Sequence, residues 1–130
     1  MAINWSLYKN FQESEYSCNC GCGAAHVSED LVAKIQELRD LCGFALPITS
    51  GVRCKTWNEM NHGHPTSAHL EGLGVDLGVD RSRARIVLQK ALDMDCFEGI
   101  GISQHTKHGR FLHLDLKPRA GGQKAFWSYS

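Results

Sequence analysis

Two histidines and one aspartate have the residue types and the setting of a metal site. His69 and Asp76 belong to the block SAHLEGLGVD at residues 67–76, and His113 lies in FLHLD at residues 111–115. Two imidazole nitrogens and one carboxylate oxygen are a ligand set of catalytic zinc, in which a fourth position stays open for water or substrate. The alternative is that the three residues are hydrogen-bonded separately, as a lone histidine usually is. The pattern predicts either an open, reactive metal site or three unrelated polar side chains.

The residues around the candidate ligands indicate how these side chains would converge. Two glycines interrupt the stretch from His69 to Asp76, so a loop that enters a strand, rather than one helix face, would bring the pair together. His113 would come from a neighbouring strand, where it shares a face with Asp115 because side chains alternate along a strand. Asp115 then has two open roles, as an acceptor that orients a ligand histidine or as a surface partner of Lys117.

The rest of the chain predicts a small sheet with helices. Residues 28–42 predict the clearest helix, which Ser28 can cap and Gly43 can end. The other expected elements are strands at 46–50, 74–79, 99–103 and 111–116, one or two helical turns at 55–61, and a helix at 80–94 that buries Ile86, Val87, Ala91 and Leu92. Before residue 17, scattered aromatic residues predict a segment anchored on the core by its rings. With no repeat and no linker, we expect one α+β domain over residues 1–130, with a small, mainly antiparallel sheet and helices packed on one side.

Composition excludes several classes of function. The 130 residues are 42% hydrophobic and 22% charged, which is ordinary for a globular domain and not for a disordered chain. Lysine and arginine (14) balance aspartate and glutamate (14), so the broad positive field that attracts nucleic acid is missing. No apolar run approaches the roughly 20 residues that span a bilayer, and the first residues lack the pattern of a signal peptide. We therefore expect no nucleic-acid partner, no integral membrane segment, and synthesis in the cytoplasm without a signal peptide.

Several motifs, taken together and in order, resemble those of a known enzyme family. They are CNCGCG at 18–23, ITSGVRC at 48–54, the block at 67–76, GIG at 99–101, FLHLD at 111–115 and WSY at 127–129. The family is that of the zinc D-alanyl-D-alanine carboxypeptidases and related peptidoglycan peptidases, which share a core with lysostaphin-type enzymes and the hedgehog signalling domain. The resemblance implies that His69, Asp76 and His113 bind one catalytic Zn²⁺ ion.

The same resemblance implies roles for further residues. Arg53 and Ser67 would hold the substrate, and the planar guanidinium of Arg53 suits a carboxylate or a developing oxyanion. Many relatives carry an acidic general base three residues before the last zinc histidine, where this chain has Arg110. Another branch uses a histidine five residues before that ligand, which makes His108 the expected catalytic proton shuttle, with His105 as its main rival.

The activity that the resemblance implies is that of a zinc metallopeptidase. It would hydrolyse peptidoglycan stem peptides at a D-alanyl bond, as a D,D-carboxypeptidase or endopeptidase. Cleavage of the L-alanyl-D-glutamate bond, as in related phage endolysins, is the close alternative, and the departure at Arg110 also leaves a non-catalytic, zinc-containing module that binds a peptide or a partner. We expect a monomer, and if it is a phage lysis enzyme we expect it to act at the bacterial cell wall after release. A cytosolic enzyme that recycles muropeptides would have the same sequence features.

Six cysteines raise the question of a second metal site or of disulfides. Cys18, Cys20 and Cys22 lie close together in the sequence, and Cys54 or His26 would complete a set of four ligands. Structural zinc sites usually space paired cysteines by two to four residues, so the alternating pattern favours buried thiols or disulfides formed after release over a structural metal. A redox or zinc-ribbon role of this cluster would make the chain a different class of protein.

A histidine-rich stretch precedes the candidate ligands. His62 and His64 lie in NHGHP at 61–65, among residues that favour loops. We expect a solvated loop here, with a place at the mouth of a substrate cleft as the alternative, and no part in metal binding.

Overall fold

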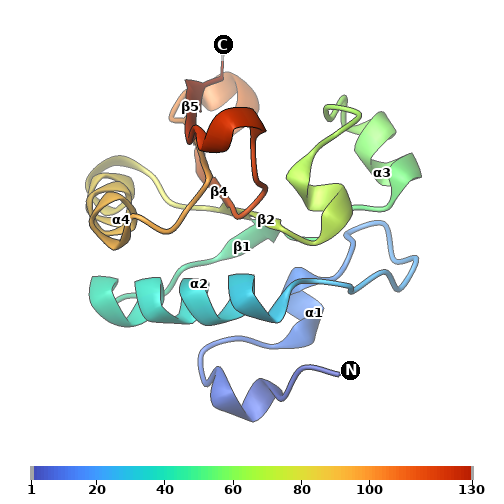
Figure 1. Cartoon of the computed structure of the whole chain (residues 1–130), viewed down its shortest axis with the longest axis horizontal. Coiled ribbons are helices and arrows are strands. Elements are labelled where there is room, and N and C mark those ends of the chain that lie inside the picture. Colours follow the sequence, from blue (N-terminus) through green and yellow to red (C-terminus); the bar gives the residue numbers. More distant parts are fainter. Residues whose placement is uncertain (1, 130) are drawn as a thin grey trace.

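A five-stranded sheet forms the centre of the structure, a computed structural model that describes residues 2–129 apart from the side chain of His108 (Figure 1). The strand order is β1-β2-β4-β3-β5, and every neighbouring pair is antiparallel except β3 and β5. The strands are β1 (Ile48–Ser50), β2 (Gly74–Leu77), β3 (Gly99–Ser103), β4 (Phe111–Asp115) and β5 (Ala125–Ser128). The expected α+β fold with a mainly antiparallel sheet is confirmed.

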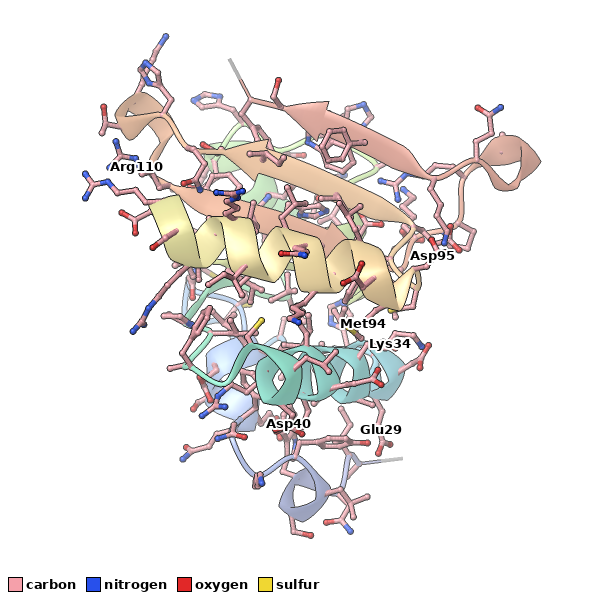
Figure 2. All side chains as sticks on the ribbon, turned by 90° about the vertical axis from the view of Figure 1, so that its left-hand side faces the viewer. Glu29, Lys34, Asp40, Met94, Asp95 and Arg110 are labelled. Atoms are coloured by element: carbon pink, nitrogen blue, oxygen red, sulfur yellow. The ribbon has the colours of Figure 1, made fainter. Side chains whose placement is uncertain are left out.

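Two long helices pack against each other and cover one face of this sheet. They are α2 (Glu29–Cys42) and α4 (Arg81–Met94), drawn in teal and yellow in Figure 2. As predicted, the hydroxyl of Ser28 caps α2 by accepting a hydrogen bond from the Leu31 N–H, and Gly43 follows the helix in the left-handed conformation (φ +74°). The apolar residues of both helices join those of β2 and β4 in one core.

The predicted buried face of α4 is wrong in part. Val87 and Ala91 are buried as expected, but Ile86 and Leu92 are 39% and 52% exposed, and Ala84 lies in the core instead. Residues 84, 87 and 91 follow the three- and four-residue spacing of one helix face. Residues 86 and 92 are rotated from that face by about 100° or more, so their position outweighs their hydrophobicity.

The N-terminal segment is anchored to the core by its aromatic rings, as the sequence predicts. Phe11 and Tyr16 are buried, and the ring centroid of Trp5 lies 5.7 Å from that of Tyr16. Tyr16 is the last residue of α1 (Glu13–Tyr16), and its carbonyl accepts a hydrogen bond of 2.8 Å from the Val52 N–H. This contact ties the N-terminal segment to the chain that follows β1.

Short helical segments form the other connections. They are η1 (Trp5–Leu7), α3 (Lys55–Met60), η2 (Ala68–Glu71), η3 (Thr106–His108) and η4 (Ala120–Gly122). Of these, α3 confirms the helical turns expected at 55–61. Throughout residues 2–129, every helix is too short or too polar to cross a membrane.

The register of the central strands decides which side chains face away from α2 and α4. Asp76 of β2 and Gly101 of β3 lie on either side of His113 in β4. Leu112 and Leu114 belong to the core shared with the helices, so the alternate residues of β4 point to the opposite face. That opposite face carries the candidate site.

Candidate metal centre

His69, Asp76 and His113 meet on the face of the sheet opposite α2 and α4. The Nε2 atom of His69 lies 3.2 Å, and the Nδ1 atom of His113 3.0 Å, from the same oxygen, Oδ1 of Asp76. One ligand atom from each residue lies within 4.8 Å of the other two, and all three residues are buried. The three predicted ligand side chains are therefore brought to one point.

A short helix and a glycine turn direct His69 toward Asp76. His69 lies in η2, whose N-cap residue Ser67 accepts a hydrogen bond of 3.2 Å from the His69 N–H through its hydroxyl. Gly72 follows η2 with φ +72°, at a place where the backbone of His26 leaves no room for a side chain. The chain then enters β2, which is the loop-to-strand path that the sequence predicts.

Each imidazole is held by the ring nitrogen that points away from Asp76, which we call its outer nitrogen. The Nδ1–H of His69 donates to the Gly51 carbonyl at 2.7 Å, and the Nε2–H of His113 donates to Oδ2 of Asp115 at 2.7 Å. In a neutral ring the other nitrogen carries a lone pair toward Asp76, where a metal ion can bind, whereas a protonated ring donates a hydrogen bond to Asp76 from the same nitrogen. Two imidazole lone pairs and one carboxylate that converge in this way fit a zinc ion with an open fourth position.

Asp115 orients His113 and does not pair with the Lys117 ammonium. Asp115 is fully buried, and the Arg119 guanidinium donates to both of its oxygens, with 3.1 Å from Nη2 to Oδ2. Burial alone would raise the pKa of Asp115, but hydrogen bonds from His113 and Arg119 lower it to about 2, so the carboxylate is ionised. The Lys117 ammonium instead donates to the Thr66 carbonyl.

The electrostatics of the cluster favour a positive charge at its centre. Burial alone would raise the pKa of Asp76, but hydrogen bonds from His113 and His69 hold it well below its usual range. Burial alone would lower the pKa of His113, but hydrogen bonds to Asp115 and Asp76 raise it above the ordinary value. A proton or a metal ion between the rings and Asp76 places positive charge next to the buried carboxylate and stabilises it. The residues therefore fit a bound cation.

Arg53 extends this cluster into the surrounding cleft. Its Nη2 donates to Oδ2 of Asp76 at 3.3 Å, and its other nitrogens donate to Oγ of Ser50 at 3.1 Å and Oδ1 of Asn58 at 3.3 Å. Arg53 and Ser67, the predicted substrate-binding residues, both line the cleft. The buried Asn58 is not predicted from the sequence, because a polar residue inside α3 carries no motif.

Aromatic side chains line the cleft, which has a volume of about 940 Å³. They are Phe111, Trp127 and Tyr129. The ring centroid of Trp127 lies 5.3 Å from that of His113, and the Arg119 guanidinium lies 5.6 Å from the Trp127 ring. Trp127 lies on β5, a strand that is not predicted from the sequence. The available signal was the pair of aromatic residues at alternate positions 127 and 129.

His62 and His64 also line the cleft, from the loop that follows α3. Both residues are exposed, and Nδ1 of His64 accepts a hydrogen bond of 3.1 Å from the Thr66 N–H. The expected solvated loop is therefore also a wall of the cleft, the alternative that the sequence left open. Neither residue belongs to the group formed by the three candidate ligands.

The predicted proton shuttle lies on η3, between β3 and β4. The side chain of His108 lies outside the described part of the chain, so its catalytic role stays a prediction. His105 is exposed, its Nδ1 accepts a hydrogen bond of 3.0 Å from the Lys107 N–H, and it is not among the described residues that line the cleft. Arg110 lies on the α4 side of the molecule, where its Nε donates to the Gln104 carbonyl at 3.0 Å (Figure 2).

The sequence as a whole also matches a protein family. The family described as Peptidase M15 matches residues 8–115, a span that includes His69, Asp76 and His113. No curated protein is a significant match to the chain. The family match covers most of the chain and agrees with the resemblance drawn from the motifs. This chain therefore belongs to the peptidase M15 family, whose members are zinc-dependent metallopeptidases.

Proposed function

We propose that this chain is a zinc peptidase that hydrolyses the stem peptides of bacterial peptidoglycan at a D-alanyl bond. The observation that carries the proposal is the convergence of His69, Asp76 and His113 within a cleft, in a chain of the peptidase M15 family. A zinc ion at this point would supply a Lewis acid that activates water and polarises the scissile carbonyl. The relation of this family to phage lysis enzymes is the ground on which we propose action at the bacterial cell wall, and we further propose that the chain acts as a monomer.

Neighbouring residues hold the ligand side chains in place. The Gly51 carbonyl fixes the ring of His69, and the Asp115 carboxylate fixes the ring of His113. Arg119 in turn fixes Asp115. Such outer partners set the orientation of a ligand ring and raise its basicity, and their loss typically costs about 10–100-fold in metal affinity or activity.

Cationic side chains along the cleft can bind a peptide with free carboxylates, beside the carboxylates of Asp76 and Asp115 that also line it. Arg53, Lys117 and Arg119 all line it. Arg53 is bonded to Asp76, which places its guanidinium to bind the carboxylate of a terminal D-amino acid or a carbonyl oxygen that gains charge. The Ser67 hydroxyl accepts a hydrogen bond from the His69 N–H, and within the described part of the chain its own proton has no acceptor, so it can donate to substrate.

We propose His108 as the group that passes a proton to the leaving amine. The support is its place five residues before His113, where one branch of similar enzymes carries a histidine. An imidazole titrates near neutral pH, and general acid catalysis typically contributes about 10²–10⁴-fold. Arg110 occupies the position at which other relatives carry the acidic base. Its side chain donates to the Gln104 carbonyl on the α4 side of the molecule, which agrees with a different proton-transfer residue in this chain.

Digestion of purified peptidoglycan tests the proposed activity. The chain is incubated with and without a chelator, His113→Ala serves as the control, and released fragments are identified by mass spectrometry. We expect chelator-sensitive release of terminal D-alanine or conversion of cross-linked dimers to monomers. New amino-terminal D-glutamate would instead identify an L-alanyl-D-glutamate endopeptidase. No fragment from a zinc-loaded chain would contradict a peptidase and favour a binding module of the same fold.

A pair of histidine variants tests the proton shuttle. His108→Ala should lower turnover by about 10²–10⁴-fold with zinc content unchanged, because only proton transfer is lost. His105→Ala, on the same segment, is the matched control and should keep nearly full turnover. Equal turnover of the two variants would contradict the role of His108.

A further inference from the structure

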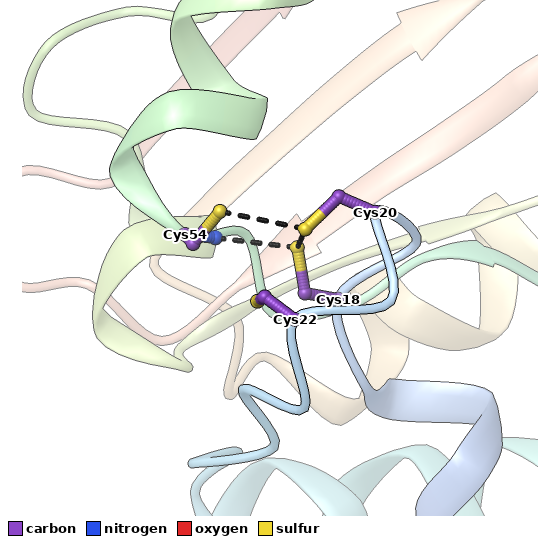
Figure 3. Close-up of side chains that lie close together, drawn as sticks. All are labelled: Cys18, Cys20, Cys22 and Cys54. Atoms are coloured by element: carbon purple, nitrogen blue, oxygen red, sulfur yellow. Dashed lines mark hydrogen bonds between the residues drawn. The ribbon is translucent and has the colours of Figure 1, made fainter.

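Four cysteines form a second group of metal-binding side chains outside the candidate catalytic centre. Cys18, Cys20 and Cys22 lie on the loop between α1 and α2, and Cys54 is the N-cap residue of α3 (Figure 3). The Sγ atoms of Cys18 and Cys20 are 3.4 Å apart, and those of Cys20 and Cys54 are 3.7 Å apart. All four sulfurs lie within 4.8 Å of one another. We call these four residues the cysteine cluster.

Two glycines explain how alternating cysteines gather their sulfurs at one point. In an extended chain, side chains two residues apart share a side but are separated by about 6.6 Å. Here Gly21 (φ +83°) and Gly23 (φ +90°) take conformations that favour glycine, and the Ala24 carbonyl accepts a hydrogen bond of 2.8 Å from the Cys18 N–H. The closed loop turns Cys22 back toward Cys18. Cysteines with the usual zinc-binding spacing of two to four residues do not need such a loop.

The distances between the sulfurs fit a tetrahedral metal site. With metal–sulfur bonds of about 2.3 Å, sulfurs at the corners of a tetrahedron lie about 3.8 Å apart. The 3.4 and 3.7 Å separations are close to this value. A disulfide joins only two sulfurs, so disulfides do not explain why four thiols surround a single point.

Backbone N–H groups around the cluster favour thiolates. They donate from Cys54 to Cys18 Sγ at 3.4 Å, from Trp57 to Cys54 Sγ at 3.4 Å, and from Ala24 to Cys22 Sγ at 3.5 Å. Such donors stabilise the negative charge that a thiol must acquire before it can bind a metal.

We propose that the cysteine cluster binds one Zn²⁺ ion through four thiolates, in a closed structural site. Each thiol releases its proton to solvent when the metal–sulfur bond forms. Tetrahedral four-sulfur sites are typical of structural zinc and leave no position for water or substrate. The geometry reverses the preference for free thiols or disulfides that the spacing alone indicates.

An ion in the cluster fastens the segment that supports the catalytic centre. Cys54 directly follows Arg53, whose backbone N–H donates to the His69 carbonyl at 3.0 Å. Gly51, at the start of the same segment, accepts the ring N–H of His69. The cluster ties this segment to the N-terminal loop, so the ion positions Arg53 and His69 and does not itself touch substrate.

Metal analysis of the reduced, full-length chain tests the site without reference to activity. We expect two zinc equivalents in the unmodified chain and one in Cys22→Ser. Cys42→Ser and Cys96→Ser are the matched controls, since both residues lie outside the cluster, and should keep two. His113→Ala should lose the other equivalent, so failure of one site is distinguished from failure of the other. Full zinc content in Cys22→Ser would overturn the proposal.

A second measurement does not require that the serine variant fold. Titration of the unmodified chain with an organomercurial thiol reagent should release one zinc equivalent, while the other stays until a chelator is added. Exchange of Co²⁺ into His113→Ala should give intense thiolate-to-metal charge-transfer absorption, since only the cysteine cluster then holds metal. No zinc release during the thiol titration, or no charge-transfer absorption, would overturn the proposal.

Discussion

The candidate catalytic centre and the cysteine cluster gather their side chains by different means. The catalytic centre takes its ligands from η2, β2 and β4, and the pairing of Asp76 with His113 follows from the register of two central strands. The cysteine cluster takes its ligands from a loop and from the residue that precedes α3, and Cys20 and Cys22 are exposed. Ladder hydrogen bonds fix Asp76 and His113 of the first group, and glycine turns fix the loop that carries three residues of the second.

This difference indicates how far each site depends on a bound ion. His69 and His113 are held by protein partners, the Gly51 carbonyl and the Asp115 carboxylate, so the catalytic centre is organised before a metal binds. The exposed part of the cysteine loop has few such partners. We therefore expect the catalytic centre to keep its form without metal and the cysteine loop to lose it.

Loss of a catalytic ligand should have the largest effect. In His113→Ala, two of the three ligands remain, and peptidase turnover should fall by several orders of magnitude because the ion is no longer held in the cleft. Fragment release from peptidoglycan measures turnover, and near-ultraviolet circular dichroism checks that the core remains packed. Turnover close to that of the unmodified chain would show that the reaction does not use this centre.

Loss of a cysteine ligand should act first on stability. A metal ion that joins Cys18 to Cys54 closes a loop of 36 residues, and a disulfide across a loop of that length contributes about 4 kcal/mol to the free energy of unfolding. Cys22→Ser should lose a similar amount in denaturant unfolding, with turnover reduced far less than in His113→Ala. Cys96→Ser is the control. Equal unfolding free energies for the two variants would contradict a stabilising metal ion in the cysteine cluster.

Removal of the carboxylate behind His113 should have an intermediate effect. Asp115→Asn keeps the side-chain volume but loses the charge that orients the ring, so zinc affinity of the catalytic centre should fall about 10–100-fold. Competition with a chelator measures this affinity. Asp95→Asn changes an exposed aspartate at the end of α4 (Figure 2) that pairs with Lys124 at 2.8 Å, and it should leave the affinity unchanged. Equal affinities of both variants would show that the centre is not organised through Asp115.

Replacement of Arg53 should have the smallest effect of the four substitutions. Arg53→Lys keeps the positive charge but loses the guanidinium fork, so kcat/KM on a soluble stem peptide should fall about tenfold. Arg83→Lys, at a guanidinium that lies 4.9 Å from the Phe44 ring, is the control and should not change kcat/KM. A larger loss of kcat/KM in Arg83→Lys than in Arg53→Lys would contradict substrate binding by Arg53.

Local signals in the sequence predict the two long helices, α3 and much of the candidate centre. Ser28 and Gly43 mark the ends of α2 because capping is a property of a few adjacent residues. Alternation in β4 places His113 and Asp115 on one face for the same local reason. The gathering of His69, Asp76 and His113 could therefore be predicted from spacing together with the family resemblance.

Long-range contacts decide what the sequence does not predict. β5 pairs in parallel with β3, and Gly101 leaves room for the Trp127 indole that packs on His113; no pattern within either segment shows this. Cys54 reaches the cysteine loop because the Val52 N–H bonds to the Tyr16 carbonyl, a contact between distant segments. Spacing alone therefore favours free thiols or disulfides where the fold assembles four ligands.

Anomalous scattering at the zinc absorption edge, from crystals of the zinc-loaded chain, shows directly which side chains hold the ion. We predict a zinc peak bonded to Nε2 of His69, a carboxylate oxygen of Asp76 and Nδ1 of His113, with the other ring nitrogens still bonded to Gly51 and Asp115. A cleft without a zinc peak, or a zinc ion held there by other side chains, would contradict it.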